Sequence, residues 1–222
     1  MTIGGDTLPG TAQAFENLRQ FARRPRRREE HCELCNAEVP AAHAHLIQVL
    51  HRKLLCTCDA CALLFTSNTG TRYKRVPRGV RRFATFNLTD AEWDALMIPI
   101  NLAFFFQHSI DSRLSALYPS PAGATESLLP LQAWNSIVDA NPLLRHLEPD
   151  VEALLVNRVG HVRGSSPADY YIVPIDACYK LVGLIRIHWR GFSGGTEVWQ
   201  EIGSFFEDLR ARSFVIAQET HA

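Results

Sequence analysis

HCELCNAEVP (residues 31–40) and LLCTCDACALLF (residues 54–65) hold five of the six cysteines of the chain. A structural zinc ion takes four tetrahedral ligands and favours thiolates, which the metal itself helps to ionise. Two Cys-x-x-Cys pairs with 22 residues between them have the spacing of such a site. The predicted ligands are Cys32, Cys35, Cys58 and Cys61. We therefore expect a zinc-ribbon-like module over residues 29–68, with two short strands between the two pairs.

The fifth cysteine of this region, Cys56, leaves an alternative open. It lies two residues before Cys58, so both side chains would face the same side of an extended strand. Cys56 could then replace Cys58 as the fourth ligand, or pack as a spare thiol beneath the metal. The preference for compact Cys-x-x-Cys turns favours Cys58. In the first pair, Asn36 suits the left-handed turn position that follows Cys35.

The spacing leaves the metal itself open between zinc and iron. A rubredoxin-type iron site uses the same four sulfurs, but its turns usually carry Pro or Gly, which CELCN and CDACA lack. We expect Zn²⁺, with Fe as the alternative and an iron–sulfur cluster on all five cysteines as a third option. The nearby histidines are interpreted as surface or supporting groups; they are His31, His43, His45 and His51. Cys178 is far from this cluster in sequence and is predicted to be a small buried residue.

Charge divides the chain into a basic and an acidic part. The net charge is zero, yet residues 19–82 contain 14 Lys or Arg against 5 Asp or Glu. Four thiolates and one dication carry a charge of −2, so a loaded site leaves much of this positive charge for a partner. Arginine-rich segments can bind phosphates, but few aromatic residues are present here to stack on bases. A solvated basic face or a dock for an acidic protein partner is therefore favoured over nucleic acid. The candidate partner-binding residues are Arg26, Arg27, Arg28, Arg72, Lys74 and Arg75.

Composition indicates a globular protein outside the membrane. Hydrophobic residues make up 46% and charged residues 21% of the 222 residues. No apolar run reaches the roughly 18 residues of a membrane helix, and the N-terminus lacks the pattern of a signal peptide. A cytoplasmic location is the expectation. In that reducing compartment clustered cysteines bind metals more often than they form disulfides.

The rest of the chain predicts an α+β domain over residues 87–214, with a mainly antiparallel sheet and packed helices. A flexible, basic tail with a short helical pattern is expected over 1–28, a basic linker or edge structure over 69–86, and a tail over 215–222. Strand patterns occupy 100–109, 113–120, 151–159 and 169–175, and helical patterns 89–98, 129–142, 176–191 and 194–214.

Capping residues support three of these helices. Thr89 with Glu92 forms a capping box, and Asp176 and Thr196 are the expected N-caps of the last two long helices. By contrast, no residue spacing indicates catalysis. A pair between His188 and Glu197 requires the fold to be assumed, and YPSPAGATESLL lacks a nucleophile elbow. We therefore lean towards a protein that is not an enzyme.

Four stretches carry a resemblance to a bacterial family: CELCNAEVPAAHAHL, LLCTCDACALLF, YPSPAGATESLLP and LVGLIRIHWRGFSGGTEVW. The chain resembles small uncharacterised proteins encoded beside oxygen-tolerant uptake [NiFe]-hydrogenase genes, over residues 30–212. The resemblance carries over no catalytic residue, and it emphasises the five cysteines between 32 and 61. It implies a role around a hydrogenase, as an assembly factor or a small redox partner.

Three functions follow as hypotheses. The leading one is a non-enzymatic metal-binding accessory protein, an assembly or interaction factor for a metalloenzyme such as [NiFe] hydrogenase, with a hydrogenase subunit or maturation factor as its partner. The second is a rubredoxin-like electron-transfer protein with iron at the four cysteines. The third is a zinc-ribbon nucleic-acid-binding protein that uses the arginine segments, with an affinity that falls steeply with salt.

Overall fold

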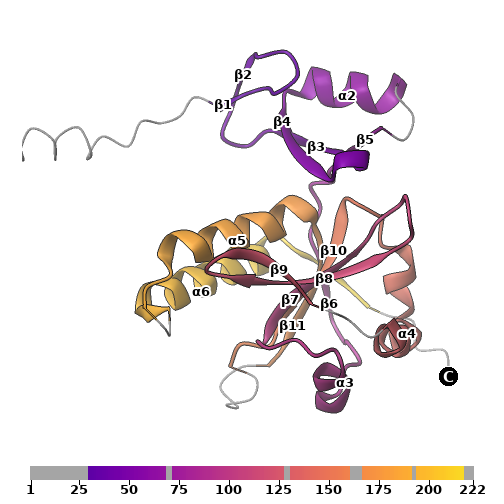
Figure 1. Cartoon of the computed structure of the whole chain (residues 1–222), viewed down its shortest axis with the longest axis vertical. Helices are drawn as coiled ribbons and strands as arrows, with labels where there is room; N and C mark the ends of the chain where they lie inside the picture. Colours follow the sequence, from indigo (N-terminus) through magenta and orange to yellow (C-terminus); the bar gives the residue numbers. More distant parts are fainter. Residues whose placement is uncertain (1–29, 69–71, 128–130, 161–166, 192–193, 218–222) are drawn as a thin grey trace, which may run out of the picture.

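The chain folds into a small cysteine-bearing unit placed on a larger sheet domain (Figure 1). This computed structural model describes residues 30–68, 72–127, 131–160, 167–191 and 194–217. The expected helical pattern in the first 28 residues and Arg26, Arg27 and Arg28 lie outside the described residues. Mixed helices and mainly antiparallel sheets confirm the predicted α+β class.

The small unit has two layers, a three-stranded sheet and a helix. Its sheet has the order β4-β3-β5, and a separate hairpin joins β1 to β2. Its elements are β1 (Glu30–His31), β2 (Glu38–Val39), β3 (Ala44–Gln48), a 3₁₀ turn (Val49–His51), β4 (Lys53–Thr57), α2 (Asp59–Asn68) and β5 (Tyr73–Arg75). The two strands expected between the cysteine pairs are β3 and β4, which pair antiparallel. The hydrophobic core between the sheet and α2 is thin, and it consists of Ala44, Leu46, Leu55, Ala62 and Tyr73.

The large domain is built on one seven-stranded sheet. Its order is β12-β6-β11-β10-β7-β8-β9, and every pair is antiparallel except β12 with β6. The strands are β6 (Arg81–Phe83), β7 (Leu102–Gln107), β8 (Leu114–Ser120), β9 (Gly123–Ser127), β10 (Glu152–Asn157), β11 (Asp169–Pro174) and β12 (Phe214–Ile216). The four predicted strand segments thus become β7, β8, β10 and β11. The basic stretch expected as linker or edge structure contributes β5 to the small sheet and β6 to the large one.

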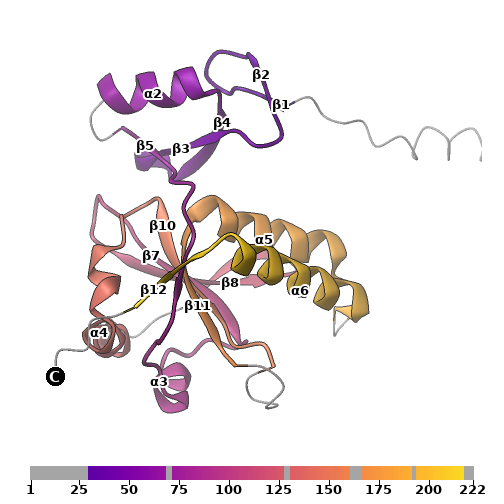
Figure 2. The ribbon, with the colours of Figure 1, turned by 180° about the vertical axis from the view of Figure 1, so that it is seen from behind.

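Helices cover both faces of the large sheet (Figures 1 and 2). These helices are α3 (Asp90–Ala95), α4 (Leu131–Ala140), α5 (Ile175–His188) and α6 (Gly195–Ala211), with a short 3₁₀ segment at Pro142–His146. On β7, Phe104 and Phe106 pack in the cluster that contains α5 and α6, whereas Phe105 packs with Trp134 of α4 on the opposite face. Side chains alternate along a strand, so burial on both faces explains the continuous apolar run LAFFF.

The helix starts agree only partly with the capping predictions. The capping box of Thr89 and Glu92 is present at α3. The N-caps expected at Asp176 and Thr196 were wrong, because α5 begins after Pro174 and α6 after Gly194. Gly194 has φ 86°, a left-handed conformation that glycine adopts without strain. Asp176 lies in the first turn of α5, which leaves its carboxylate free to reach the small unit.

The small unit packs on the large domain through apolar and charged contacts. Ile47 and Val49 belong to the same hydrophobic cluster as the helices α5 and α6. The ammonium group of Lys74 lies 2.9 Å from a carboxylate oxygen of Asp150, which is buried at the top of the large sheet. His45 also contacts the large domain, through Asp176. These contacts hold the cysteine-bearing unit against one end of α5.

Candidate metal centre

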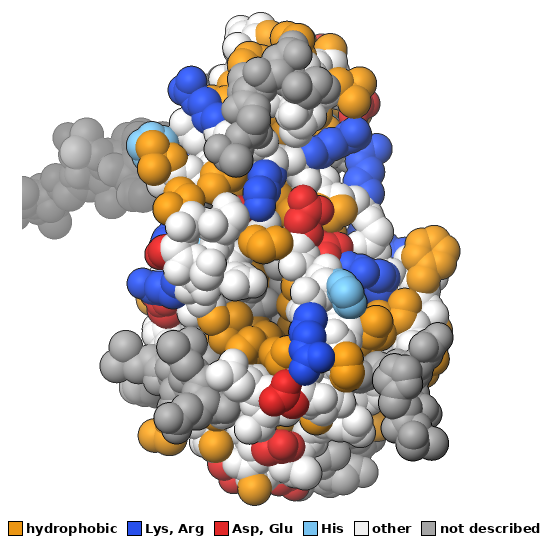
Figure 3. Space-filling view, turned by 90° about the vertical axis from the view of Figure 1, so that its right-hand side faces the viewer, with side chains coloured by type: hydrophobic (Ala, Val, Ile, Leu, Met, Phe, Trp, Pro, Cys, Tyr) orange, Lys and Arg blue, Asp and Glu red, His pale blue; other side chains and the backbone are white. Residues whose placement is uncertain are grey.

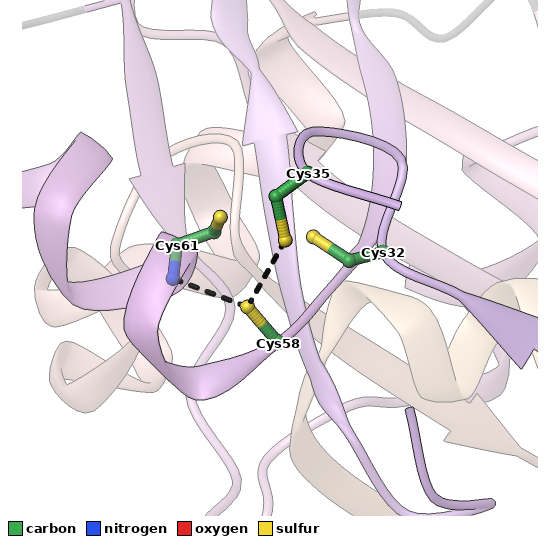
Figure 4. Close-up of side chains that lie close together, drawn as sticks. All are labelled: Cys32, Cys35, Cys58 and Cys61. Atoms are coloured by element: carbon green, nitrogen blue, oxygen red, sulfur yellow. Dashed lines mark hydrogen bonds between the residues drawn. The ribbon is translucent and has the colours of Figure 1, made fainter. Parts of the chain in front are cut away.

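The first cysteine pair lies on the turn between β1 and β2. The N–H of Cys32 donates to the carbonyl of Ala37 at 2.7 Å, and the N–H of Asn36 donates to the carbonyl of Cys32 at 2.8 Å. Asn36 has φ 60°, the left-handed conformation expected from the sequence. This tight turn brings both thiols of the pair to the same side, where they point towards the start of α2 (Figure 4).

The second pair lies at the junction of β4 with α2. Unlike the first pair, it does not lie between two strands: Cys58 follows β4 directly and Cys61 sits in the first turn of the helix. The N–H of Cys61 donates to the sulfur of Cys58 at 3.4 Å, and the N–H of Ala62 donates to the carbonyl of Cys58 at 2.9 Å. Exposed N–H groups at a helix start favour negative charge, so this location suits thiolates.

The four sulfurs converge on one small volume (Figure 4). The ligand atoms of Cys32, Cys35, Cys58 and Cys61 all lie within 4.8 Å of one another. The sulfurs of Cys35 and Cys58 are 3.7 Å apart. Four zinc–sulfur bonds of about 2.3 Å in a tetrahedron require sulfurs about 3.8 Å apart. The donor set and its spacing therefore fit a tetrahedral zinc or iron ion, and a four-cysteine cluster that can bind a metal is present.

The cluster also perturbs its own thiols. Burial opposes ionisation of Cys32, but N–H groups of Cys58, Cys35 and Leu34 that point at its sulfur lower its pKa to about 6. Burial and the neighbouring cysteines raise the pKa of Cys61. The lowered pKa of Cys32 and the raised pKa of Cys61 mean that one thiolate forms readily and that it opposes the ionisation of further thiols nearby. A bound cation would remove that repulsion, because it compensates all four thiolates.

Cys56 lies in a different cluster from the four converging cysteines. It faces His45 across the β3–β4 pair, and its sulfur lies within 4.8 Å of ligand atoms of His43 and His45. The strand ends at Thr57 and the chain then enters α2, so Cys58 turns away from the face that Cys56 occupies. Geometry thus favours Cys58 over Cys56 as the fourth ligand. The periodicity of a strand could not indicate this, because it assumes that the strand continues.

Of the predicted partner-binding residues, the structure describes Arg72, Lys74 and Arg75, and each of them already contacts another side chain. Lys74 pairs with Asp150 inside the junction, so it serves the fold. Arg72 lies over the ring of Tyr73, and Arg75 is 3.9 Å from Asp59 on an exposed face. Figure 3 shows Lys and Arg side chains over the small unit and the junction on one side of the molecule, with acidic side chains interspersed and gathered at the far end.

A buried polar network under the small unit was not found by sequence reasoning. A ring nitrogen of His108 lies 3.0 Å from the hydroxyl of Ser115, which donates to Glu126 at 3.1 Å. The other ring nitrogen is 4.0 Å from Asp150, beyond hydrogen-bond distance. Ser115 is buried near the start of β8 and its hydroxyl is already shared with a carboxylate. This arrangement supports a structural network better than a nucleophile with its base.

Two further features of the large domain bear on function. His188 and Glu197 do approach, at 2.8 Å, but the pair joins α5 to α6 at the surface. A mainly apolar cavity of about 840 Å³ lies beside the same helices. It is lined in part by Tyr118, Trp189 and Trp199, and Trp199 is 45% exposed. The cavity is wide enough to receive apolar side chains of another molecule.

Comparison with protein families gives one match. Residues 31–213 match the model described as a family of unknown function, DUF5947. The chain belongs to the DUF5947 family. The matched range contains both cysteine clusters and the whole seven-stranded sheet except its last strand. Comparison with curated proteins and with solved structures found no match for this DUF5947 protein. Among its described residues, no helix has the length and apolar character that crossing a membrane requires.

Proposed function

We propose that this DUF5947 protein is a cytoplasmic, non-enzymatic accessory protein in which a Zn²⁺ ion at the four cysteines holds a small docking unit in shape. The convergence of Cys32, Cys35, Cys58 and Cys61 is the observation that carries the proposal. Its spacing fits four thiolates around one ion, and a site filled by four protein ligands has no open position for a substrate. Such sites stabilise folds and interaction surfaces.

The partner in this proposal is a protein, and specifically a hydrogenase subunit or a maturation factor of [NiFe] hydrogenase. The resemblance to proteins encoded beside hydrogenase genes supports that choice. The basic surface of the small unit supports an acidic partner face, and the cavity beside Trp189 and Trp199 offers a site for apolar contacts. Internal pairing of Lys74 and the partial pairing of Arg75 reduce the positive charge left for any anionic partner, so the apolar cavity is the stronger support for a protein.

The proposal is tested by affinity capture from the native host at two salt concentrations. We expect a tagged protein to enrich a hydrogenase subunit or maturation factor, and Trp199→Ala to reduce this enrichment while the metal content stays unchanged. Phe214→Ala, which removes an exposed aromatic side chain of the large domain outside the cavity lining, is the matched control. Recovery of ribosomes or DNA without any hydrogenase component, lost on raising the salt, would instead support nucleic-acid binding.

The iron alternative has a separate test. Cys35 is exposed, so an iron ion at this site would lie close to the surface, as electron transfer requires. A native preparation with iron–thiolate absorption in the visible region and one iron per chain would replace the zinc proposal. A colourless preparation with one zinc at the four cysteines supports it.

A further inference from the structure

Cys56, which lies outside the four-cysteine cluster, belongs to a second group of side chains that can ligate a metal. His43, His45 and Cys56 place their ligand atoms within 4.8 Å of one another, at the junction with the large domain. His43 immediately precedes β3 and His45 lies within it, and Cys56 lies directly opposite His45 in the register. The imidazole rings meet edge to face, with centroids 4.6 Å apart.

Oxygen acceptors fix the tautomer of both rings. Nδ1 of His43 lies 2.8 Å from the carbonyl oxygen of Pro40, and Nδ1 of His45 lies 2.8 Å from a carboxylate oxygen of Asp176. A carbonyl can only accept, so Nδ1 of His43 carries a proton, and in the neutral ring its Nε2 then carries a lone pair. The carboxylate favours the same tautomer for His45. Metal-bound histidines typically hold their second ring nitrogen in this way, against a carboxylate or a backbone carbonyl.

The lone pair of His43 lacks a donor. Its Nε2 is buried, and it has no hydrogen-bond partner among the described residues. The side chain of His43 is only 5% exposed. A buried acceptor left unsatisfied destabilises the fold, so a fold that positions one needs a compensating interaction. A cation bound to this nitrogen would supply it.

We propose that His43, His45 and Cys56 form a second metal site, which takes a thiophilic transition-metal ion such as Zn²⁺. Two imidazoles and one thiolate are borderline-to-soft donors that suit this class of ion and exclude Mg²⁺ and Ca²⁺. Three protein ligands leave a fourth position of a tetrahedral ion open. The site therefore differs in kind from the closed four-cysteine cluster: its metal can be exchanged or can bind an external ligand.

The surroundings of the site support exchange with an outside ligand. The three residues line a cavity of about 540 Å³, whose other walls include Arg78, Lys180 and Arg212. The walls also carry the carboxylates of Glu30 and Asp176, and Arg78 and Arg212 are paired with Asp59 and Asp208. A thiolate or carboxylate of another molecule would complete the tetrahedron around the ion. The cavity draws on both units, because Asp176 and Lys180 belong to α5.

The two metal clusters are linked through one residue of the first turn. The N–H of Glu33, which follows Cys32, donates to the carbonyl of Cys56 at 2.8 Å, and its carboxylate accepts from the N–H of Cys56 at 3.0 Å. The backbone of Cys56 is therefore held by the turn that carries the first cysteine pair. A filled four-cysteine site would preorganise the second site, so the closed site is expected to load first.

Metal titration of the full chain tests this second site. Under reducing conditions, protein already loaded with one Zn²⁺ equivalent is titrated with Co²⁺ and followed by its thiolate–cobalt absorption. We expect one Co²⁺ to bind with a spectrum that indicates a single thiolate. Cys56→Ser and His43→Ala should each abolish this absorption while the first zinc is retained, and His51→Ala should leave it unchanged.

The titration distinguishes failure of the second metal site from failure of the four-cysteine site on which the proposed function depends. If the wild-type chain binds only one metal, or if Cys56→Ser leaves the cobalt spectrum unchanged, the second site is wrong and the first stands. If the chain fails to hold even the first zinc, the proposed function fails. Asp176→Asn is the positioning variant: it should weaken cobalt binding by about 10- to 100-fold while the cobalt spectrum keeps its shape. An unchanged affinity in that variant would remove Asp176 from the site.

Discussion

The large domain buries a hydrophobic cluster on each face of its sheet, whereas the small unit buries only a few apolar side chains besides its cysteines. The large-domain clusters contain whole aromatic side chains such as Phe104, Phe105 and Tyr171. The core of the small unit includes two alanines among its five buried residues. Burial of apolar surface is the main stabilising contribution to folding, and units this small usually need metals or disulfides in addition. From this comparison we expect the large domain to fold by burial of apolar surface alone and the small unit to need a bound metal in addition.

The largest expected effect comes from removing one ligand of the first site. In Cys61→Ser we expect loss of one metal equivalent and local unfolding of the small unit, because structural zinc contributes about 10–16 kcal/mol in zinc-finger peptides. Metal analysis and proteolysis between residues 30 and 75 measure both effects. Cys178→Ala is the matched control, since Cys178 is buried in the large domain. Retention of metal and of protection in Cys61→Ser would contradict the comparison.

A core substitution in the large domain should show the opposite pattern. Phe104 is fully buried between the sheet and α5, and Phe104→Ala removes a large apolar side chain. We expect the free energy of unfolding to fall by about 3–5 kcal/mol while the metal content stays at the wild-type value. Denaturant unfolding and metal analysis of the same sample check this. A loss of metal in parallel would show that the two units fold as one.

A smaller effect is expected at the junction between the units. Lys74→Ala leaves the carboxylate of Asp150 buried without its cation, and we expect a loss of roughly 3 kcal/mol at neutral pH. Burial opposes ionisation of Asp150, but hydrogen bonds from Ser109 and Lys74 outweigh it and lower its pKa.

The lowered pKa of Asp150 predicts how the effect of Lys74→Ala depends on pH. A carboxyl group whose pKa is lowered in the folded state stabilises the fold above its ordinary pKa, near 4, and this contribution disappears as the pH falls further. The difference between wild type and Lys74→Ala should therefore shrink between pH 7 and pH 3. Denaturant unfolding at both values measures it. A difference that stays constant would mean that Asp150 does not depend on Lys74.

The helices and strands that could be predicted from the sequence are those with a regular pattern of apolar residues along a short stretch of chain. The alternating or fully apolar strands, the stripe of α6 and the capping box at Thr89 depend only on neighbouring residues. The turn of the first Cys-x-x-Cys pair is local in the same sense, whereas the second pair lies at a strand–helix junction that the cysteine spacing does not indicate. The strand β9 was missed because GATES has little apolar character, and it pairs with β8 along its whole length.

The second cluster could not be predicted, because it depends on contacts across long stretches of sequence. His45 is held by Asp176, 131 residues later, and the orientation of Cys56 depends on where β4 ends. Alternation correctly indicated that Cys56 faces one side of the strand, but it could not indicate that Cys58 turns away. Histidines near a cysteine pair were a signal for this site, and only the fold shows which of them approach Cys56.

Hydrogen exchange before and after metal removal by a tight zinc chelator tests the central claim most directly. We predict that amide protection disappears in β3, β4 and α2 while β7, β10 and β11 keep theirs, and that one added zinc equivalent restores the lost protection. If β3 and α2 stay protected in protein shown to contain no metal, the small unit holds itself together without an ion, and the account is contradicted.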